Sequence, residues 1–333
     1  MRTGRRATTL RDGEAKAEAL YRQAEKLRTR RGRGDCREAF RLYLRAAALG
    51  HLEAANSAGV MLSAGEGVLK NYRRALALFG VAADGGHPAS MSNLGDMYCR
   101  GLGLRRNHVK AFHWFRCAAM RGDARGMYDL GVCFNNGESV RKNPRRATLW
   151  YQKAAALGNT MAMAALGHRL LDGYTVRRNR AEGMRLLATA ANSGCREAML
   201  DLGGRYFWGE GLGCDYAKAF FWFRRAAMRG DARGMYELGL CYANGESVKK
   251  SSRRAVYWYR KSASLGEPEA MAEIGRRSFV GDGVRCDRQN GMRLLRTAAR
   301  RGNSGAARFL KRIARKEKGQ TARKRQKRSR PGG

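Results

Sequence analysis

A glycine recurs every 36 residues along most of this 333-residue chain, each time within the same short sequence motif. The copies are Gly59, Gly95, Gly131, Gly167, Gly203, Gly239 and Gly275. Self-similarity at a fixed period of this size is typical of stacked repeats, in which each unit buries its apolar face against its neighbours. Such a chain is expected to bind or bridge other molecules rather than to catalyse a reaction.

Each 36-residue unit predicts two helices, because two start positions recur in it. The first helix follows polar residues suited to an N-cap, namely Asp123, Asn159, Asp231 and Asn303, and it ends in a glycine-bearing loop. The second helix follows one slot that always holds Asn, Asp or Ser, whose side chains satisfy free backbone N–H groups. That slot holds Asp35, Asn71, Asn107, Asn143, Asn179, Asp215, Ser251 and Asp287. A further glycine, such as Gly122, ends the second helix as a C-cap glycine does.

The recurring glycine inside the first helix requires its own explanation, since glycine in a helix interior costs about 0.5 to 1 kcal/mol relative to alanine. We expect a bulky residue of a neighbouring helix to lie over the bare backbone. The predicted covering residues, interpreted as core, are Leu78, Trp114, Trp150, Leu186, Trp222, Trp258 and Leu294.

The combined pattern resembles the Sel1-like repeat family, relatives of tetratricopeptide repeats. It is carried by Leu202, Gly203, Tyr206, Gly209, Gly211, Asp215, Lys218, Ala219, Trp222, Ala226, Ala227 and Gly230. The resemblance implies an all-α, right-handed α-α superhelix whose members act as adaptors, and it brings no catalytic or cofactor-binding residues. The chain departs from the family in having Asn at four second-helix caps, no secretory signal and no regular pairing of its cysteines.

The expected organisation has five parts. Residues 1–13 form a basic, disordered segment, 14–53 a degenerate N-terminal repeat or cap, and 54–305 seven repeats. Residues 306–316 form a C-terminal capping helix, and 317–333 a disordered basic tail. A second period of 108 residues aligns residues 118–128 with an identical stretch at 226–236. This longer period indicates duplication of a three-repeat block. The duplication either has no functional role or provides two equivalent surfaces that bind two similar ligand segments.

The chain is strongly basic, with 67 Lys and Arg against 28 Asp and Glu and a net charge of +39. The two ends do not account for this, because the repeat array between residues 35 and 310 still carries +22. A protein of this charge attracts phosphates, acidic protein surfaces or anionic lipid. A GC-rich genome, which enriches Arg, Ala and Gly together, is the alternative explanation.

Two sets of basic residues are candidate sites for an anionic partner. Loops before the second helices carry Arg105, Arg106, Arg141, Lys142, Arg177, Arg178, Lys249 and Lys250. Stacked repeats would align these loops into a ladder, with a gap at Gly213 and Cys214, although a merely solvated face is an equal alternative. The tail cluster of Arg323, Lys324, Arg325, Lys327 and Arg328 is typical of a nuclear localisation signal or a nucleic-acid arm.

The eight cysteines include no Cys-x-x-Cys, a pattern that favours reduced thiols inside a cell. We therefore expect a nuclear or cytoplasmic protein without membrane insertion, with a mitochondrial presequence as the alternative. Cys99, His108, His113 and Cys117 suggest zinc, but other copies fill the Cys117 slot with exposed residue types, so no metal site is expected. No catalytic set is found either.

The function predicted from the sequence is a non-catalytic adaptor that holds a protein partner on its concave face. The basic edge and tail would contact nucleic acid or an acidic partner. The alternative is a scaffold associated with RNA or a ribonucleoprotein, in which the loop cations bind phosphates directly and salt weakens binding.

Overall fold

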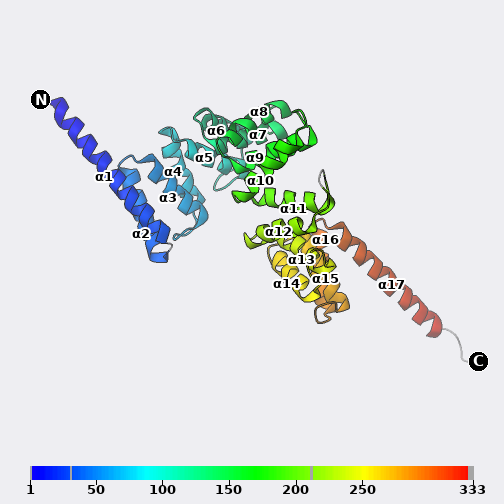
Figure 1. Cartoon of the computed structure of the whole chain (residues 1–333). Coiled ribbons are helices and arrows are strands. Elements are labelled where there is room, and N and C mark those ends of the chain that lie inside the picture. Colours follow the sequence, from blue (N-terminus) through cyan, green and yellow to red (C-terminus); the bar gives the residue numbers. More distant parts are fainter. Residues whose placement is uncertain (1, 31, 211–212, 329–333) are drawn as a thin grey trace, which may run out of the picture. The chain divides into compact units, whose positions relative to one another are not determined.

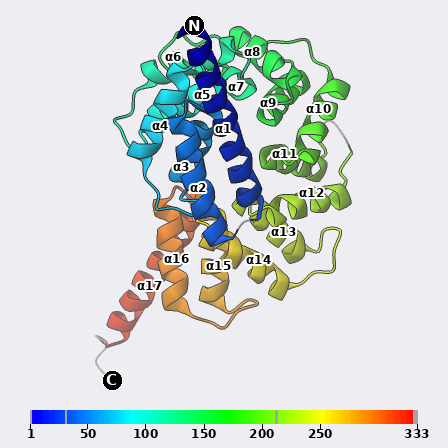
Figure 2. The same ribbon diagram turned by 90° about the vertical axis from the view of Figure 1, so that its left-hand side faces the viewer.

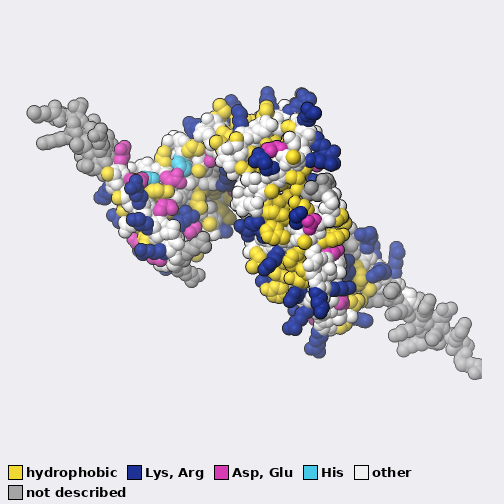
Figure 3. All heavy atoms as spheres, in the orientation of Figure 1, with side chains coloured by type: hydrophobic (Ala, Val, Ile, Leu, Met, Phe, Trp, Pro, Cys, Tyr) yellow, Lys and Arg dark blue, Asp and Glu magenta, His cyan; other side chains and the backbone are white. Residues whose placement is uncertain are grey.

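The computed structural model describes residues 2–30, 32–210 and 213–328. Every regular element in those ranges is an α-helix, as the repeat pattern predicts, and no strand occurs among them. The helices fall into two compact units, residues 1–183 and 184–333. In both units Lys and Arg side chains are scattered over the visible surface, with fewer Asp and Glu among them (Figure 3).

Within each unit, every helix packs against the next one in sequence (Figures 1 and 2). The first unit contains α1 (Arg2–Arg30), α2 (Arg33–Ala48), α3 (Leu52–Ala64), α4 (Tyr72–Asp84), α5 (Pro88–Arg100), α6 (His108–Met120), α7 (Ala124–Asn136), α8 (Pro144–Ala156) and α9 (Thr160–Asp172). Helix α10 (Arg180–Asn192) includes the boundary between the units. The second unit continues with α11 (Arg196–Trp208), α12 (Tyr216–Met228), α13 (Ala232–Asn244), α14 (Ser252–Ser264), α15 (Pro268–Val280), α16 (Arg288–Arg300) and α17 (Ser304–Arg328).

The capping prediction is confirmed at seven of the eight second-helix starts. In α6, for example, the Asn107 side chain accepts a hydrogen bond of 2.9 Å from the Lys110 backbone N–H. It is wrong at Asp35, because α2 begins at Arg33 and its N-cap is Gly32. The glycine pair that ends the first helix in most other copies is replaced there by Thr29 and Arg31, and α1 continues to Arg30.

The repeat glycines do lie against a bulky side chain, but the residue predicted to cover them is wrong by one position. A Cβ atom on Gly95 would lie 2.4 Å from the Phe115 ring, and one on Gly203 would lie 2.4 Å from the Phe223 ring. Of the residues interpreted as core, Trp222 and Leu186 are buried, whereas Trp114, Trp150 and Trp258 pack against the core and remain half-buried. One residue turns the side chain by about 100° around a helix, so only the second of the two faces the paired helix.

The two terminal helices are longer than expected. We expected disorder in residues 1–13 and after residue 316, whereas α1 begins at Arg2 and α17 continues to Arg328. Residues 317–328 are rich in Arg, Lys and Gln, which favour helix even without an apolar face. In the described part of the chain, none of the helices combines the length and apolar character needed to cross a membrane.

Candidate binding grooves

A groove of about 1030 Å³ lies between the second helices of two consecutive repeats in the first unit. We call it the α6–α8 groove, because its walls come from α6, α8 and the loop 137–143, with contributions from the end of α7. Its apolar lining consists of Phe112, Met120, Leu130, Phe134, Val140, Leu149 and Trp150, and its polar lining consists of Arg116, Arg141, Lys142, Asn143, Arg146 and Lys153.

The apolar lining combines fixed rings with open aliphatic side chains. Phe112 and Phe134 meet edge to face, with ring centroids 5.7 Å apart, and so form a firm base. Met120 and Leu149 are much more open, with 72% and 59% of their surfaces exposed. The groove therefore offers apolar area that no other part of the described chain covers.

The polar side chains of the groove carry positive charge only. Five of them are Arg or Lys, and the lining contains neither Asp nor Glu. None of the five forms an ion pair with another described residue. Two lie over aromatic rings instead, with Arg146 5.8 Å from the Phe134 centroid and Lys153 4.7 Å from the Trp150 centroid. These cations are thus held beside apolar surface and free to pair with an incoming anion.

Two further grooves occupy the same position within the repeat. One of about 840 Å³ lies between α2 and α4, and one of about 630 Å³ in the second unit lies between α14 and the loop before α16. Phe40, Phe112 and Val256 are equivalent lining residues, separated by whole multiples of 36. Both linings include Arg residues and neither includes an acidic one. A cationic and apolar groove is therefore a property of this repeat position.

A pocket between first helices has a different character. It has a volume of about 350 Å³ and lies between α11 and α13 in the second unit. Its cations already have carboxylate partners: Arg205 lies 2.8 Å from Asp201, and Arg233 lies 3.6 Å from Glu237. Burial raises the pKa of Glu237. Its charges are internally compensated, so it lacks the open positive potential of the grooves.

The eight loop cations predicted as a site are all exposed, but they do not share one environment. Arg141 and Lys142 line the α6–α8 groove, whereas the side chain of Arg178 donates a hydrogen bond of 2.8 Å to the Leu171 carbonyl in the last turn of α9. Residues 323–328 belong to α17, and the side chains of the predicted tail cluster lie outside the described residues. Phe112, Met120 and Leu149 were missed, because periodicity marks apolar positions without distinguishing covered from open ones.

The four residues weighed as a zinc site separate into two groups. On α6, His113 Nε2 lies 3.6 Å from the Cys117 sulfur, one helical turn away. Cys99 and His108 instead gather with Glu138, a residue of the following repeat. Burial first, and then the charges of Glu138 and Asp96, raise the pKa of the Cys99 thiol.

Comparison with known proteins identifies the repeat. The sequence model of the Sel1 repeat matches residues 30–51, 52–87, 88–123, 124–159, 160–195, 196–231, 232–267 and 268–303. The chain belongs to the Sel1 repeat family. The fold predicted from the sequence is confirmed, and the first matched copy, at residues 30–51, lies within the predicted N-terminal repeat. Sel1 repeat proteins generally mediate protein–protein interactions, and the family is typically non-catalytic.

Two solved Sel1 repeat structures are similar to this Sel1 repeat protein. The first is c5321, a protective antigen present in uropathogenic Escherichia coli strains, with 28% identity and a TM-score of 0.60. The match covers 92% of this chain and 66% of c5321. The second is a Sel1 repeat protein from Oxalobacter formigenes, with 27% identity, a TM-score of 0.61, and coverage of 73% of this chain and 96% of the other. No curated protein matches the sequence.

Proposed function

We propose that this Sel1 repeat protein is a non-catalytic adaptor that holds an acidic, partly apolar segment of a partner protein in the α6–α8 groove. The observation that supports this most directly is the lining, which combines five unpaired cations with exposed apolar side chains and contains no carboxylate. The proposal places the partner on second helices and their loops. The concave face remains a prediction from the sequence.

The expected ligand chemistry follows from the two kinds of lining. Burial of Leu149 and Met120 against apolar side chains of the ligand would contribute favourable binding free energy, about 25 cal/mol per Å² of apolar surface removed from water. Arg141 and Arg146 each present a planar fork that matches a carboxylate. A segment that places Asp or Glu on both sides of Leu or Phe would satisfy both.

The RNA-associated scaffold is the second candidate, and the net charge of +39 supports it. A phosphate backbone would pair with the same cations but would leave Met120 and Leu149 without a role. Binding to RNA should weaken steeply with salt, with a slope of about −0.7 in log K per phosphate neutralised on a single strand. The apolar part of a peptide contact should resist salt, which separates the two ligand classes.

We place this role inside the cell, in the nucleus or the cytoplasm. Two features support the placement: the eight cysteines are all free thiols, and the C-terminal basic cluster is typical of a nuclear localisation signal. Expression of the tagged chain with and without residues 317–333 tests the nuclear part by microscopy. Unchanged nuclear accumulation on removing those residues would argue against the cluster as the signal.

The binding experiment compares two labelled probes by fluorescence anisotropy over a salt series. One probe is a peptide that alternates Asp with Leu and Phe, and the other is an oligouridine of similar charge. The test variant is Arg141→Glu with Lys142→Glu, inside the groove. The matched control is Arg105→Glu with Arg106→Glu, which makes the same charge change in the same loop slot one repeat earlier, outside the groove lining.

We expect the groove variant to weaken peptide binding by on the order of 10-fold or more, since each lost charge-assisted contact contributes about 1.5 to 3 kcal/mol. The control should change affinity several-fold less. Leu149→Ala should weaken binding of the peptide and leave binding of the oligouridine unchanged. Equal effects of the two charge reversals would show that general charge, not the groove, holds the ligand. Tight oligouridine binding without peptide binding would favour the RNA scaffold.

A further inference from the structure

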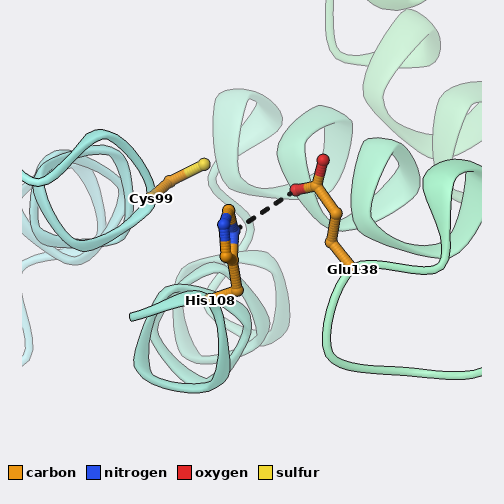
Figure 4. A group of neighbouring side chains, drawn as sticks. All are labelled: Cys99, His108 and Glu138. Atoms are coloured by element: carbon orange, nitrogen blue, oxygen red, sulfur yellow. Dashed lines mark ion pairs between the residues drawn. The ribbon is translucent and has the colours of Figure 1, made fainter. Parts of the chain in front are cut away.

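Three side chains that can bind a metal converge in the first unit, outside the grooves. Cys99, His108 and Glu138 each offer one ligand atom, and these three atoms lie within 4.8 Å of one another. His108 Nδ1 lies 3.6 Å from Glu138 Oε2. Figure 4 shows the sulfur, the imidazole and the carboxylate pointing toward a common space. No other group of three His, Cys, Asp or Glu ligands meets the same distance in the described chain.

Local structure fixes where each ligand comes from. Cys99 is in the last turn of α5, and His108 is the first residue of α6. Glu138 follows the end of α7, between Gly137 and Ser139, which both have positive φ angles, of 79° and 63°. The left-handed conformation is costly for Ser139 and turns the loop sharply at this point. The loop thereby brings a residue of the next repeat to Cys99 and His108.

Hydrogen bonding leaves the ligand atoms available. The Asn136 amide donates to Glu138 Oε1 at 3.2 Å, so that Oε2 is the oxygen turned to the imidazole. His108 Nδ1 is buried from solvent and has no hydrogen-bond partner. An imidazole nitrogen binds a metal ion in its neutral form. A buried ring nitrogen that lacks a hydrogen-bond partner and faces a thiol and a carboxylate therefore requires an explanation.

We propose that Cys99, His108 and Glu138 bind a divalent transition metal ion of the zinc type, with one further position open to water. Zinc accepts sulfur, nitrogen and oxygen ligands in tetrahedral geometry at bond lengths near 2.0 to 2.3 Å, which places neighbouring ligand atoms about 3.4 Å apart. The imidazole and carboxylate already lie 3.6 Å apart. Binding requires the Cys99 sulfur to close in by rotamer adjustment and to release its proton to solvent.

The related three-repeat block provides an internal comparison. A shift of 108 residues replaces Cys99 by Phe207 and His108 by Tyr216, while Glu138 becomes Glu246. Aromatic side chains therefore suffice for packing at the first two positions, since Phe207 and Tyr216 contact each other edge to face. Cys99 and His108 are therefore not needed for the repeat fold, whereas the glutamate is present in both blocks.

A bound ion would join the repeat at residues 88–123 to the loop of the repeat that follows it. That loop also carries Arg141 and Lys142 on the rim of the α6–α8 groove. The ion would cross-link the loop at the groove rim to α5 and α6. Metal binding should therefore stabilise the first unit, because a ligand that binds only the folded state raises its stability.

The experiment loads the full-length protein, stripped with a chelator and kept reduced, with Co²⁺ alone and then with Zn²⁺ alone. One equivalent of tetrahedral Co²⁺ with a thiolate ligand gives intense visible bands and a sulfur-to-cobalt charge-transfer band. Zinc should displace the cobalt, bleach these bands and raise the melting temperature followed by circular dichroism. The test variants are Cys99→Ser and Glu138→Gln, and the matched control is His113→Ala with Cys117→Ser.

We expect Cys99→Ser to abolish the charge-transfer band and to lower the zinc affinity by on the order of 100-fold. Loss of even an indirect partner of a metal ligand lowers metal affinity about 10- to 100-fold. Glu138→Gln should keep the charge-transfer band at a lower affinity, and the control should bind as the unaltered protein does. The helical circular dichroism of each variant shows that it is folded. Absence of the band in the unaltered protein, or its loss in the His113 and Cys117 variant alone, would overturn the proposal.

Discussion

The contact between Gly203 and Phe223 leads to a prediction with an internal control in the neighbouring residue. Gly203 lies inside α11, where a Cβ would be 2.4 and 2.6 Å from two carbons of the Phe223 ring. Gly204, the next residue, has nothing within 4 Å of the same added atom. Replacing each glycine by alanine makes the same chemical change at two adjacent positions that differ in their surroundings.

The magnitude follows from two opposing contributions. Alanine in a helix interior is favoured over glycine by about 0.5 to 1 kcal/mol. At Gly203 the new methyl group would overlap Phe223 by about 1 Å, because carbon atoms prefer separations near 3.5 to 4.0 Å. The ring cannot easily move aside, since Phe223 is only 3% exposed and packs among Leu200, Tyr206 and Phe207. Overpacking of this kind costs about 1 to 3 kcal/mol.

We therefore expect Gly204→Ala to raise the free energy of unfolding by about 0.5 to 1 kcal/mol and Gly203→Ala to lower it by up to about 2.5 kcal/mol. The difference in the free energy of unfolding between the two variants, about 1 to 3 kcal/mol, isolates the steric contribution because the helix preference of alanine is the same in both. Urea unfolding followed by circular dichroism measures both. If the two variants are equally stable, Phe223 does not lie over Gly203 as the structure has it.

Two further predictions concern a helix cap and a buried carboxyl group. Asn107→Ala should lower the free energy of unfolding by about 1 kcal/mol because α6 loses its side-chain cap, and Asp35→Ala should cost less because Asp35 caps no helix; urea unfolding of the pair checks this. Burial, together with the charges of Asp96 and Asp123, raises the pKa of Asp129 from 3.8 to about 7, so the folded state holds a proton that the unfolded chain has lost, and stability falls as the pH rises from about 4 to about 7. Asp129→Asn should remove this fall, so that the substitution raises the free energy of unfolding by on the order of 2 kcal/mol more at pH 8 than at pH 4. If the melting temperatures of the unaltered protein and the variant change equally between these pH values, the assignment is contradicted.

The features that the sequence predicted correctly depend on local backbone chemistry. A cap such as Asn107 acts on an N–H group three residues away, and a helix end such as Gly122 needs only its own positive φ of 86°. Local rules failed where the local sequence changed. At Asp35 the preceding glycine loop is missing, and in residues 317–328 helix-forming residues continue without an apolar face.

The packing of specific side chains was decided by the tertiary structure. The sequence located the glycine that must be covered, but not whether Trp114 or Phe115 covers it, since that depends on the rotation of one helix against another. For the same reason, periodicity placed apolar residues along α6 and α8 but did not show that Met120 and Leu149 remain open.

The candidate sites also required contacts between residues far apart in sequence. Basic loop residues were visible in the sequence, yet only the tertiary structure shows that Arg141 and Lys142 line a groove while Arg178 bonds to the end of α9. The sequence grouped Cys99 and His108 with His113 and Cys117 of α6, whereas Glu138 reaches them from the next repeat. The sequence by itself thus determined the repeat, its two helices and most of their ends, because those follow from interactions within a few residues. Which side chains meet across repeats was decided by the tertiary structure, because it depends on how one repeat is rotated and shifted against the next.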